Sequence, residues 1–124
     1  MTKIVAELDR MAIVDFLSRF KAIASEDVLT VFERENYKTT LTELGILPSQ
    51  AREVILGLTI ENYYKGIGLG DRDGEQVCEF GTFLADRELY IKLMIDNLYH
   101  KAICFSFHFA ERDIVHPFAN GDVG

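Results

Sequence analysis

Two neighbouring β-like segments, residues 87–96 and 101–109, constrain the fold of this chain more than any other feature. RELYIKLMID and KAICFSFHF are dense in β-branched and aromatic residues, and the short stretch DNLYH lies between them. Such a spacing is typical of two strands folded about a turn. QVCEFGTF, residues 76–83, has the same character and comes before them. We therefore expect a meander of at least three antiparallel strands.

The N-terminal half of the chain has helical periodicity instead. Residues 9–24 place apolar side chains at three- and four-residue steps, which predicts an amphipathic helix: Ile13, Phe16, Leu17, Phe20 and Ile23. A second helix is predicted over 48–58, because Pro48 can occupy a first helical position and apolar residues follow at helical spacing. Residues 28–31 fit a short strand, and the segment that follows, up to residue 46, is ambiguous.

The remaining segments are predicted to be turns and ends. Thr59 can cap a short turn that Gly66 ends, and GIGLGDRDGE, residues 66–75, is expected to be a mobile loop. The C-terminal tail is expected to cover one sheet edge through Phe118 and then fray. With no repeat and no linker, residues 1–124 form one domain. The predicted fold class is α+β, with N-terminal helices packed on one face of a twisted antiparallel sheet.

Alternation along the two strands predicts which side chains share a face. The odd positions within 89–95 and within 103–107 are all apolar and are expected to be buried. With the turn centred near Tyr99, Tyr90 should lie opposite His108. The exposed face would then carry Tyr90, Lys92, Met94, Ala102, Cys104, Ser106 and His108.

This exposed face has two interpretations. It is either the ordinary solvated side of a half-covered sheet, or a site where a phenol, an ammonium and an imidazole converge. His108 lies between Phe107 and Phe109, and an imidazole can both accept and donate a proton near neutral pH. The pattern alone leaves both interpretations open.

Composition limits the function classes. A chain of 124 residues with 48% hydrophobic residues can bury about two thirds of its unfolded surface. The net charge of −7 opposes a simple nucleic-acid surface, because phosphates are contacted by clustered Lys and Arg. No signal-peptide core or membrane-length apolar run is present, so a cytoplasmic protein without membrane contact is expected. Cys78 and Cys104 are expected to be buried free thiols.

The sequence lacks the motifs of three common kinds of functional site: a phosphate-binding loop, a metal site and a nucleophile with its base. GIGLGDRDG follows no apolar strand and precedes no helix N-terminus, so it is no phosphate-binding loop. His100, His108 and His116 recur every eight residues, a spacing that does not suggest a metal site. Ser106 and His108 lie two residues apart on one strand, about 7 Å, too far for a nucleophile and its base. We expect no metal and no cofactor.

The order of these segments resembles a known family. Two helices, LTIENYYKG, a glycine-rich stretch, VCEFG, LYIKL and CFSFHFAERDIVHPF follow one another as in the MqsR-like branch of the RelE superfamily. These are bacterial toxins of type II toxin–antitoxin systems. The resemblance covers roughly residues 10–118 and is sharpest from Val54 to Phe118.

The resemblance implies a metal-independent endoribonuclease, an mRNA interferase. It also implies two partners, an mRNA substrate and a cognate antitoxin protein, and no DNA binding by the protein itself. The family's catalytic positions match Lys65 in ENYYKG, Glu79 in VCEF, Tyr90 in LYIK and His108 in FSFH. Tyr90 and His108 are expected to transfer protons while Lys65 holds the phosphate.

Two further cations, Lys92 and Arg112, are candidates for binding the substrate. Glu111 and Arg112 could orient His108, contact phosphate or form only a surface pair. The chain departs from the family's pattern at two positions: Glu79 stands where an amide is found, and His108 replaces a lysine. A second hypothesis follows from the acidic composition, namely a non-catalytic protein-interaction domain on the same fold.

Overall fold

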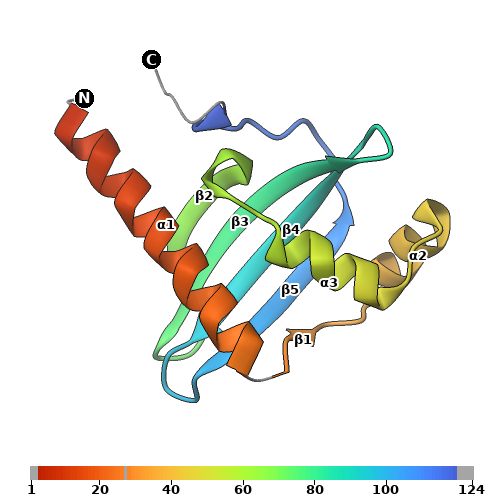
Figure 1. Cartoon of the computed structure of the whole chain (residues 1–124), viewed down its shortest axis with the longest axis horizontal. Helices are drawn as coiled ribbons and strands as arrows, with labels where there is room; N and C mark the ends of the chain where they lie inside the picture. The colour runs from red at the N-terminus through yellow and green to blue at the C-terminus, as the bar shows by residue number, and fades with distance from the viewer. Residues whose placement is uncertain (1–2, 27, 120–124) are drawn as a thin grey trace.

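Three helices and a five-stranded sheet make up the described part of the molecule (Figure 1). The computed structural model describes residues 3–26 and 28–119. The elements, in chain order, are α1 (Lys3–Glu26), β1 (Thr30–Val31), α2 (Glu35–Leu44), α3 (Pro48–Leu56), the 3₁₀ turn η1 (Ile60–Asn62), β2 (Tyr63–Leu69), β3 (Glu75–Leu84), β4 (Arg87–Asp96) and β5 (Lys101–Phe109). The strand order is β1-β5-β4-β3-β2.

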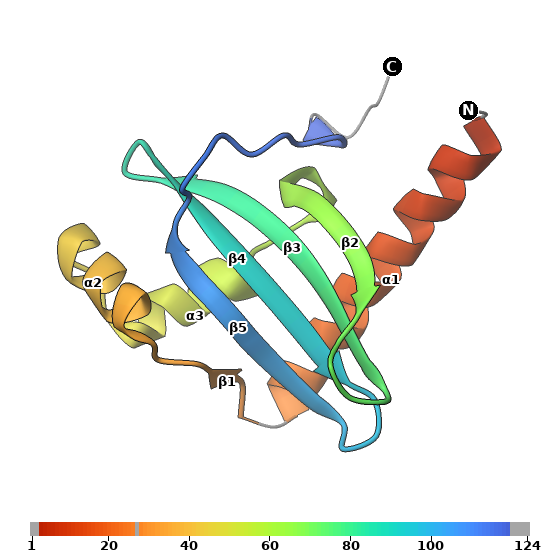
Figure 2. The same ribbon diagram turned by 180° about the vertical axis from the view of Figure 1, so that it is seen from behind.

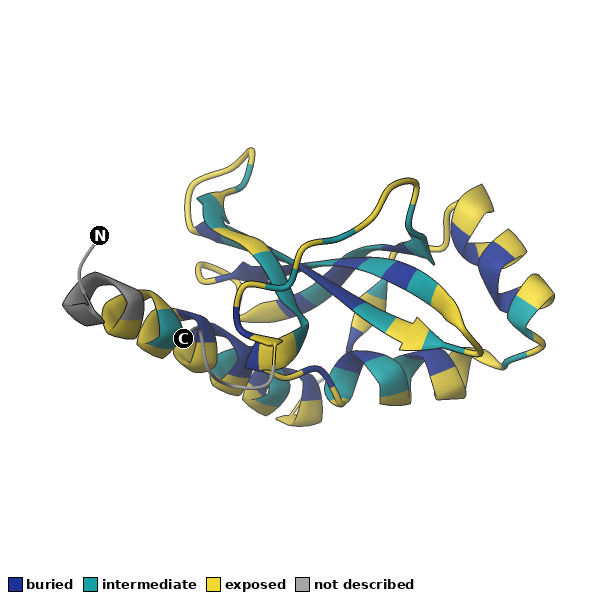
Figure 3. Ribbon diagram, turned by 90° about the horizontal axis from the view of Figure 1, so that it is seen from above, coloured by how far each residue is buried: buried dark blue, intermediate teal, exposed yellow. Residues whose placement is uncertain are grey.

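The sheet has one covered face and one open face. Helices α1 and α3 lie across one side, and the view from behind shows the strands without a helix in front of them (Figure 2). Seen from above, buried residues gather where the sheet meets these helices (Figure 3). The α+β prediction is therefore confirmed. The expected helices over 9–24 and 48–58 correspond to α1 and α3, and α3 ends two residues early, at Leu56.

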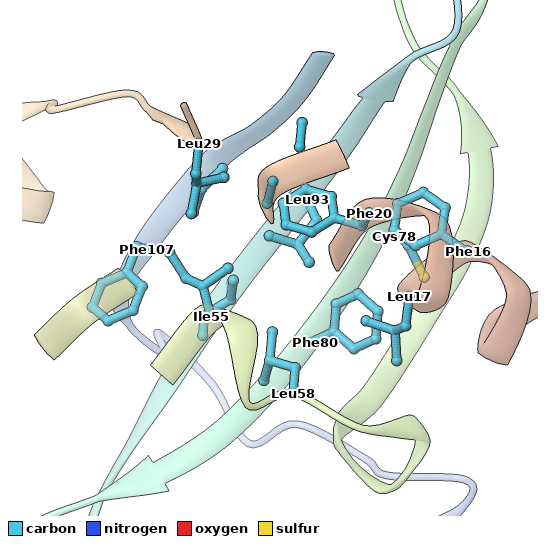
Figure 4. Close-up of a cluster of buried hydrophobic side chains, with 14 of the residues drawn as sticks. Phe16, Leu17, Phe20, Leu29, Ile55, Leu58, Cys78, Phe80, Leu93 and Phe107 are labelled. Carbon is cyan, nitrogen blue, oxygen red and sulfur yellow. The ribbon is translucent and has the colours of Figure 1, made fainter. Parts of the chain in front are cut away.

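The core fills the space between the helices and the covered face (Figure 4). Phe16 and Phe20 of α1 are fully buried, and the Phe16 ring lies 6.5 Å from that of Phe80 on β3. Burying each such ring contributes roughly 1.5–3 kcal/mol to the free energy of unfolding. At the β5 end of the sheet, Tyr37 of α2 packs edge-on against Phe107 at 5.9 Å.

The sequence predicted a purely antiparallel sheet, but the sheet is mixed. The short strand β1 pairs in parallel with β5, Thr30 opposite Ile103 and Val31 opposite Cys104. The ambiguous segment after it forms helix α2. Gly45 ends α2 in the left-handed region, at φ 69°, where its N–H donates to the carbonyls of Leu41 and Thr42.

The predicted loop over residues 66–75 is wrong for residues 66–69, and only residues 70–74 connect two strands. Thr59 caps the turn η1 as expected, since its hydroxyl accepts from the N–H of Glu61, but residues 63–69 then form the edge strand β2. β2 pairs with β3 through two register shifts, and its glycines allow the irregular backbone. Lys65 therefore lies on a strand, opposite Glu79, and not at a helix end.

The predicted pairing of Tyr90 with His108 is confirmed, whereas the predicted face of Ala102 and Cys104 is wrong. β4 and β5 change register between Lys92 and Leu93, so that Phe105 is an extra residue on β5. Beyond such a bulge the alternation is reversed. Ala102 and Cys104 are accordingly buried in the core, and Ile103 joins Met94 on the open face.

The C-terminal tail, residues 110–119, crosses one end of the open face (Figure 2). Phe118 is buried beside Tyr63 of β2, with ring centroids 5.7 Å apart, so the predicted edge cover is confirmed. The predicted fraying falls on residues 120–124, outside the described residues.

The two cysteines are buried free thiols, as predicted. Cys78 and Cys104 both pair with Leu93, from opposite sides, so a whole strand separates them by about 10 Å. That exceeds the span of a disulfide. Burial raises the pKa of each thiol to about 12. Within residues 3–26 and 28–119, no helix is long and apolar enough to span a bilayer.

Candidate functional site

A cavity of about 390 Å³ opens on the uncovered face of the sheet where the tail crosses it. We call it the site cavity. It is lined by Tyr64, Lys65, Glu79, Tyr90, His108, Ala110, Glu111, Arg112 and Ile114. All four predicted catalytic residues and Arg112 are in this set. The structure thus brings together side chains from β2, β3, β4, β5 and the tail.

Strand register explains why these side chains meet. Lys65, Glu79 and Lys92 lie side by side on β2, β3 and β4, because Glu79 pairs with both of the others. Two residues before Lys92 on β4, Tyr90 pairs with His108 of β5. Side chains of one face alternate along each strand, so both rows point to the open side.

Tyr90 and Glu79 form the shortest contact in the cavity. The Tyr90 hydroxyl donates to Glu79 Oε1 at 2.6 Å, a charge-assisted hydrogen bond. Burial, the hydrogen bond to Glu79 and the Glu79 charge all raise the pKa of Tyr90. The phenol therefore stays protonated at physiological pH and acts as a donor, not as a base.

The ring of His108 has one nitrogen fixed and one available. Its Nδ1 lies 2.9 Å from the Phe109 carbonyl, which only accepts, so Nδ1 carries a proton. In the neutral ring Nε2 is then the acceptor, and in the imidazolium it is a donor. The ring packs against that of Tyr90, with centroids 5.2 Å apart and planes at 37°.

The tail forms one wall of the cavity and is held by Glu88 of β4. Glu88 Oε2 lies 2.9 Å from His116 Nε2, and Glu88 Oε1 accepts from the N–H of Ile114 at 3.3 Å. The tail passes so close to Gly81 that a β-carbon there would lie 2.7 Å from the end of Ile114. The missing side chain of Gly81 lets the wall lie against the sheet.

The charges around the cavity are balanced within a molecule of net charge −7. Lys65 and Arg112 are exposed cations at its rim, and Glu79 and Glu111 are its carboxylates. The Lys65 Nζ lies 5.3 Å from the ring centroid of Tyr64. The local balance is thus less negative than the whole molecule, which removes part of the electrostatic objection to an anionic ligand.

Lys92 is the predicted site residue that the cavity does not include. It lines a second cavity on the same open face. The two cavities adjoin, because Lys92 is directly paired with Glu79.

Each histidine has its own partner, and no shared ligand set forms. His100 contacts Glu26 at 3.2 Å and His116 contacts Glu88, whereas His108 bonds the Phe109 carbonyl. Among the described residues, no group of three or more His, Cys, Asp or Glu side chains could hold a metal ion.

The sequence did not indicate three elements of this site. Tyr64 and Ile114 line the cavity, and the Glu88–His116 contact holds its wall. Nothing in the pattern separates Tyr64 from the neighbouring Tyr63. The contact between Glu88 and His116 joins residues 28 positions apart and has no local signal.

Comparison with known proteins adds no identity: no family model, curated protein or solved structure matches this chain. The chemistry of the cavity therefore carries the functional argument. It offers a carboxylate, an imidazole nitrogen free for proton transfer, a phenol donor and two cations. That set can move protons and stabilise an anion in one place.

Proposed function

We propose that the protein is a metal-independent endoribonuclease, an mRNA interferase toxin of a type II toxin–antitoxin system in the MqsR-like branch of the RelE superfamily. The observation that carries the proposal is the convergence of Lys65, Glu79, Tyr90, His108 and Arg112 on one cavity. These residues come from five different segments, and four of them match the family's catalytic positions.

RNA cleavage by this route needs a base and an acid. The base removes the proton of a ribose 2′-hydroxyl, whose oxygen attacks the adjacent phosphorus, and the acid protonates the departing 5′-oxygen. Glu79 is the better base of the cavity, because Tyr90 holds its proton too tightly for that role. The imidazolium form of His108 then serves as the acid through Nε2, the nitrogen that its hydrogen bond to Phe109 leaves available.

Tyr90, Lys65 and Arg112 have supporting roles in this scheme. The single O–H of Tyr90 fixes the Glu79 carboxylate, and it can donate instead to a phosphate oxygen that approaches it. Lys65 and Arg112 at the rim offset the charge that builds on the phosphate as the 2′-oxygen attacks. The partner that controls such a toxin would be an antitoxin that closes the open face.

The test is cleavage of a single-stranded RNA by purified protein in excess chelator, with the product ends identified. The scheme predicts 2′,3′-cyclic phosphate ends, because the 2′-oxygen is the nucleophile. Tyr90→Phe should retain the fold and reduce the cleavage rate, and Lys65→Ala should reduce it as well. Removing one donor or cation that stabilises developing charge typically slows a reaction about 100- to 1,000-fold.

Phe83→Ala is the matched control, since Phe83 is exposed and lines neither cavity described on the open face. It should cleave at the wild-type rate. Intact RNA with folded wild-type protein would refute the nuclease proposal and favour the alternative, a protein-interaction domain that binds through the open face.

A further inference from the structure

The second cavity on the open face has a composition unlike the first. It measures about 370 Å³, and apolar residues of three neighbouring strands, Val77, Met94 and Ile103, contribute to its lining. Phe32, just after β1, and Phe105, the bulged residue of β5, line its side. Phe32 exposes 38% of its surface, so it is not part of the packed core.

Phe32, Arg34 and Phe105 form a cluster that we call the aromatic platform, in which the two ring planes are tilted by 42°. The two rings lie 5.2 Å apart, and the Arg34 guanidinium carbon is 4.3 Å from the centroid of Phe105 and 5.7 Å from that of Phe32. Lys92 Nζ lies 5.2 Å from the Phe105 centroid. Two cations thus lie over aromatic rings at the edge of a shallow apolar cavity.

Proteins that bind single-stranded nucleic acids use this combination of aromatic rings and cations. A base can stack on an aromatic ring or on a guanidinium plane, and nearby cations contact the phosphates on either side. A group that only filled the core would be buried away from solvent, and a group that only solubilised the face would need no aromatic rings.

We propose that the aromatic platform stacks one base of a single-stranded RNA whose scissile phosphate lies in the site cavity. The inference rests on the proposed ribonuclease function and names a binding subsite for its substrate. Phe105 is three residues from His108 along β5, about 10 Å, so one RNA strand can contact both. Lys92 lies between them on the path, paired with Ser106.

Charge favours this path over the far end of the second cavity. Arg34 belongs to the platform and Lys92 lies beside it, whereas Asp71 and Glu75 line the cavity from the β2–β3 turn and β3. The Glu75 carboxylate is already bound by Arg72, whose Nε lies 3.1 Å from Glu75 Oε2. A phosphate backbone would therefore follow Arg34 and Lys92 and avoid Asp71 and Glu75.

The experiment measures binding separately from cleavage. The probe is a fluorescent single-stranded oligoribonucleotide with 2′-O-methyl groups throughout, which lacks the nucleophile for cleavage. Its affinity is measured for wild type, Phe105→Ala, Phe32→Ala and the conservative Phe105→Trp, with Phe83→Ala as the control. Thermal unfolding shows that each variant is folded before its affinity is compared.

We expect Phe105→Ala and Phe32→Ala each to weaken binding about 5- to 100-fold, the range for loss of one stacked base. Phe105→Trp and Phe83→Ala should bind like wild type. Equal binding by all variants, with wild-type RNA cleavage intact, would overturn the platform and leave the nuclease proposal standing. Platform-dependent binding without any cleavage would support the platform and refute the nuclease. If wild type does not bind the probe, the platform is refuted.

Discussion

The two faces of the same sheet differ in what their side chains do. On the covered face, Phe80, Ile91 and Leu93 are fully buried against the helices, and all three side chains are apolar. On the open face, the neighbouring positions Glu79, Tyr90 and Lys92 are polar and half-buried. Because alternate residues of one strand serve opposite faces, stability and chemistry can be changed almost independently.

The largest expected effect is on the covered face. Phe80→Ala should lower the free energy of unfolding by about 3–5 kcal/mol, because a large ring packed against Phe16 and Tyr63 leaves a cavity. Denaturant unfolding measures it. Phe83→Ala, an exposed position on the same strand, should change stability by no more than about 0.5 kcal/mol. Equal losses at both positions would contradict the assignment of the core.

The buried thiols predict how stability depends on pH. Burial raises the pKa of Cys78 and Cys104 from 9.0 to about 12, so the unfolded chain releases these protons at lower pH than the folded protein does. Below pH 9 the two thiols make their full contribution to the free energy of unfolding, and this contribution is lost as pH rises toward 12. By pH 10 the raised pKa of each thiol should have lowered the free energy of unfolding by about 1.4 kcal/mol.

Unfolding titrations between pH 7 and pH 10 test this pH dependence. Cys78→Ala should reduce the decline by about 1.4 kcal/mol without removing it, because Cys104 and the tyrosines with raised pKa, Tyr37, Tyr63 and Tyr90, still titrate. A decline of unchanged size in that variant would mean that other groups cause it.

A smaller effect, an increase in stability, is expected from changing the turn that joins β3 to β4. Ala85 and Asp86 both have positive φ, 53° and 64°, a type I′ turn that favours Asn-Gly. The double substitution Ala85→Asn, Asp86→Gly should raise the free energy of unfolding by about 1 kcal/mol. RNA cleavage should not change, because neither residue lines the site cavity. Lower stability would show that the turn has a different backbone.

The sequence predicted the centre of the candidate site well and its surroundings poorly. Tyr90 and His108 were placed together from the alternation of apolar residues and a turn expected near Tyr99. The pairs beside the real turn are offset by one residue, and the bulge at Phe105 restores the expected pairing. The bulge at Phe105 was missed because no glycine or proline marks it, and it reversed the faces of Ala102 and Cys104. Lys65 was assigned to a turn because Gly66 and Gly68 of β2 are typical of turns and loops.

Long-range pairing explains the other differences. The parallel pairing of β1 with β5 joins residues more than 70 positions apart, and the tail is fixed to the sheet through Glu88 and His116. Neither contact has a local periodicity. Helix α2 buries only Tyr37, Thr40 and Leu41, too few apolar positions to distinguish it from a strand by pattern.

The most direct test of the account is to measure cleavage and stability together for His108→Ala. The account predicts at least a 100-fold slower cleavage of single-stranded RNA, because the proton donor is lost. It also predicts a free energy of unfolding within about 1 kcal/mol of wild type, because His108 lies on the open face outside the core. Wild-type cleavage by this variant would contradict the assignment of chemistry to the open face.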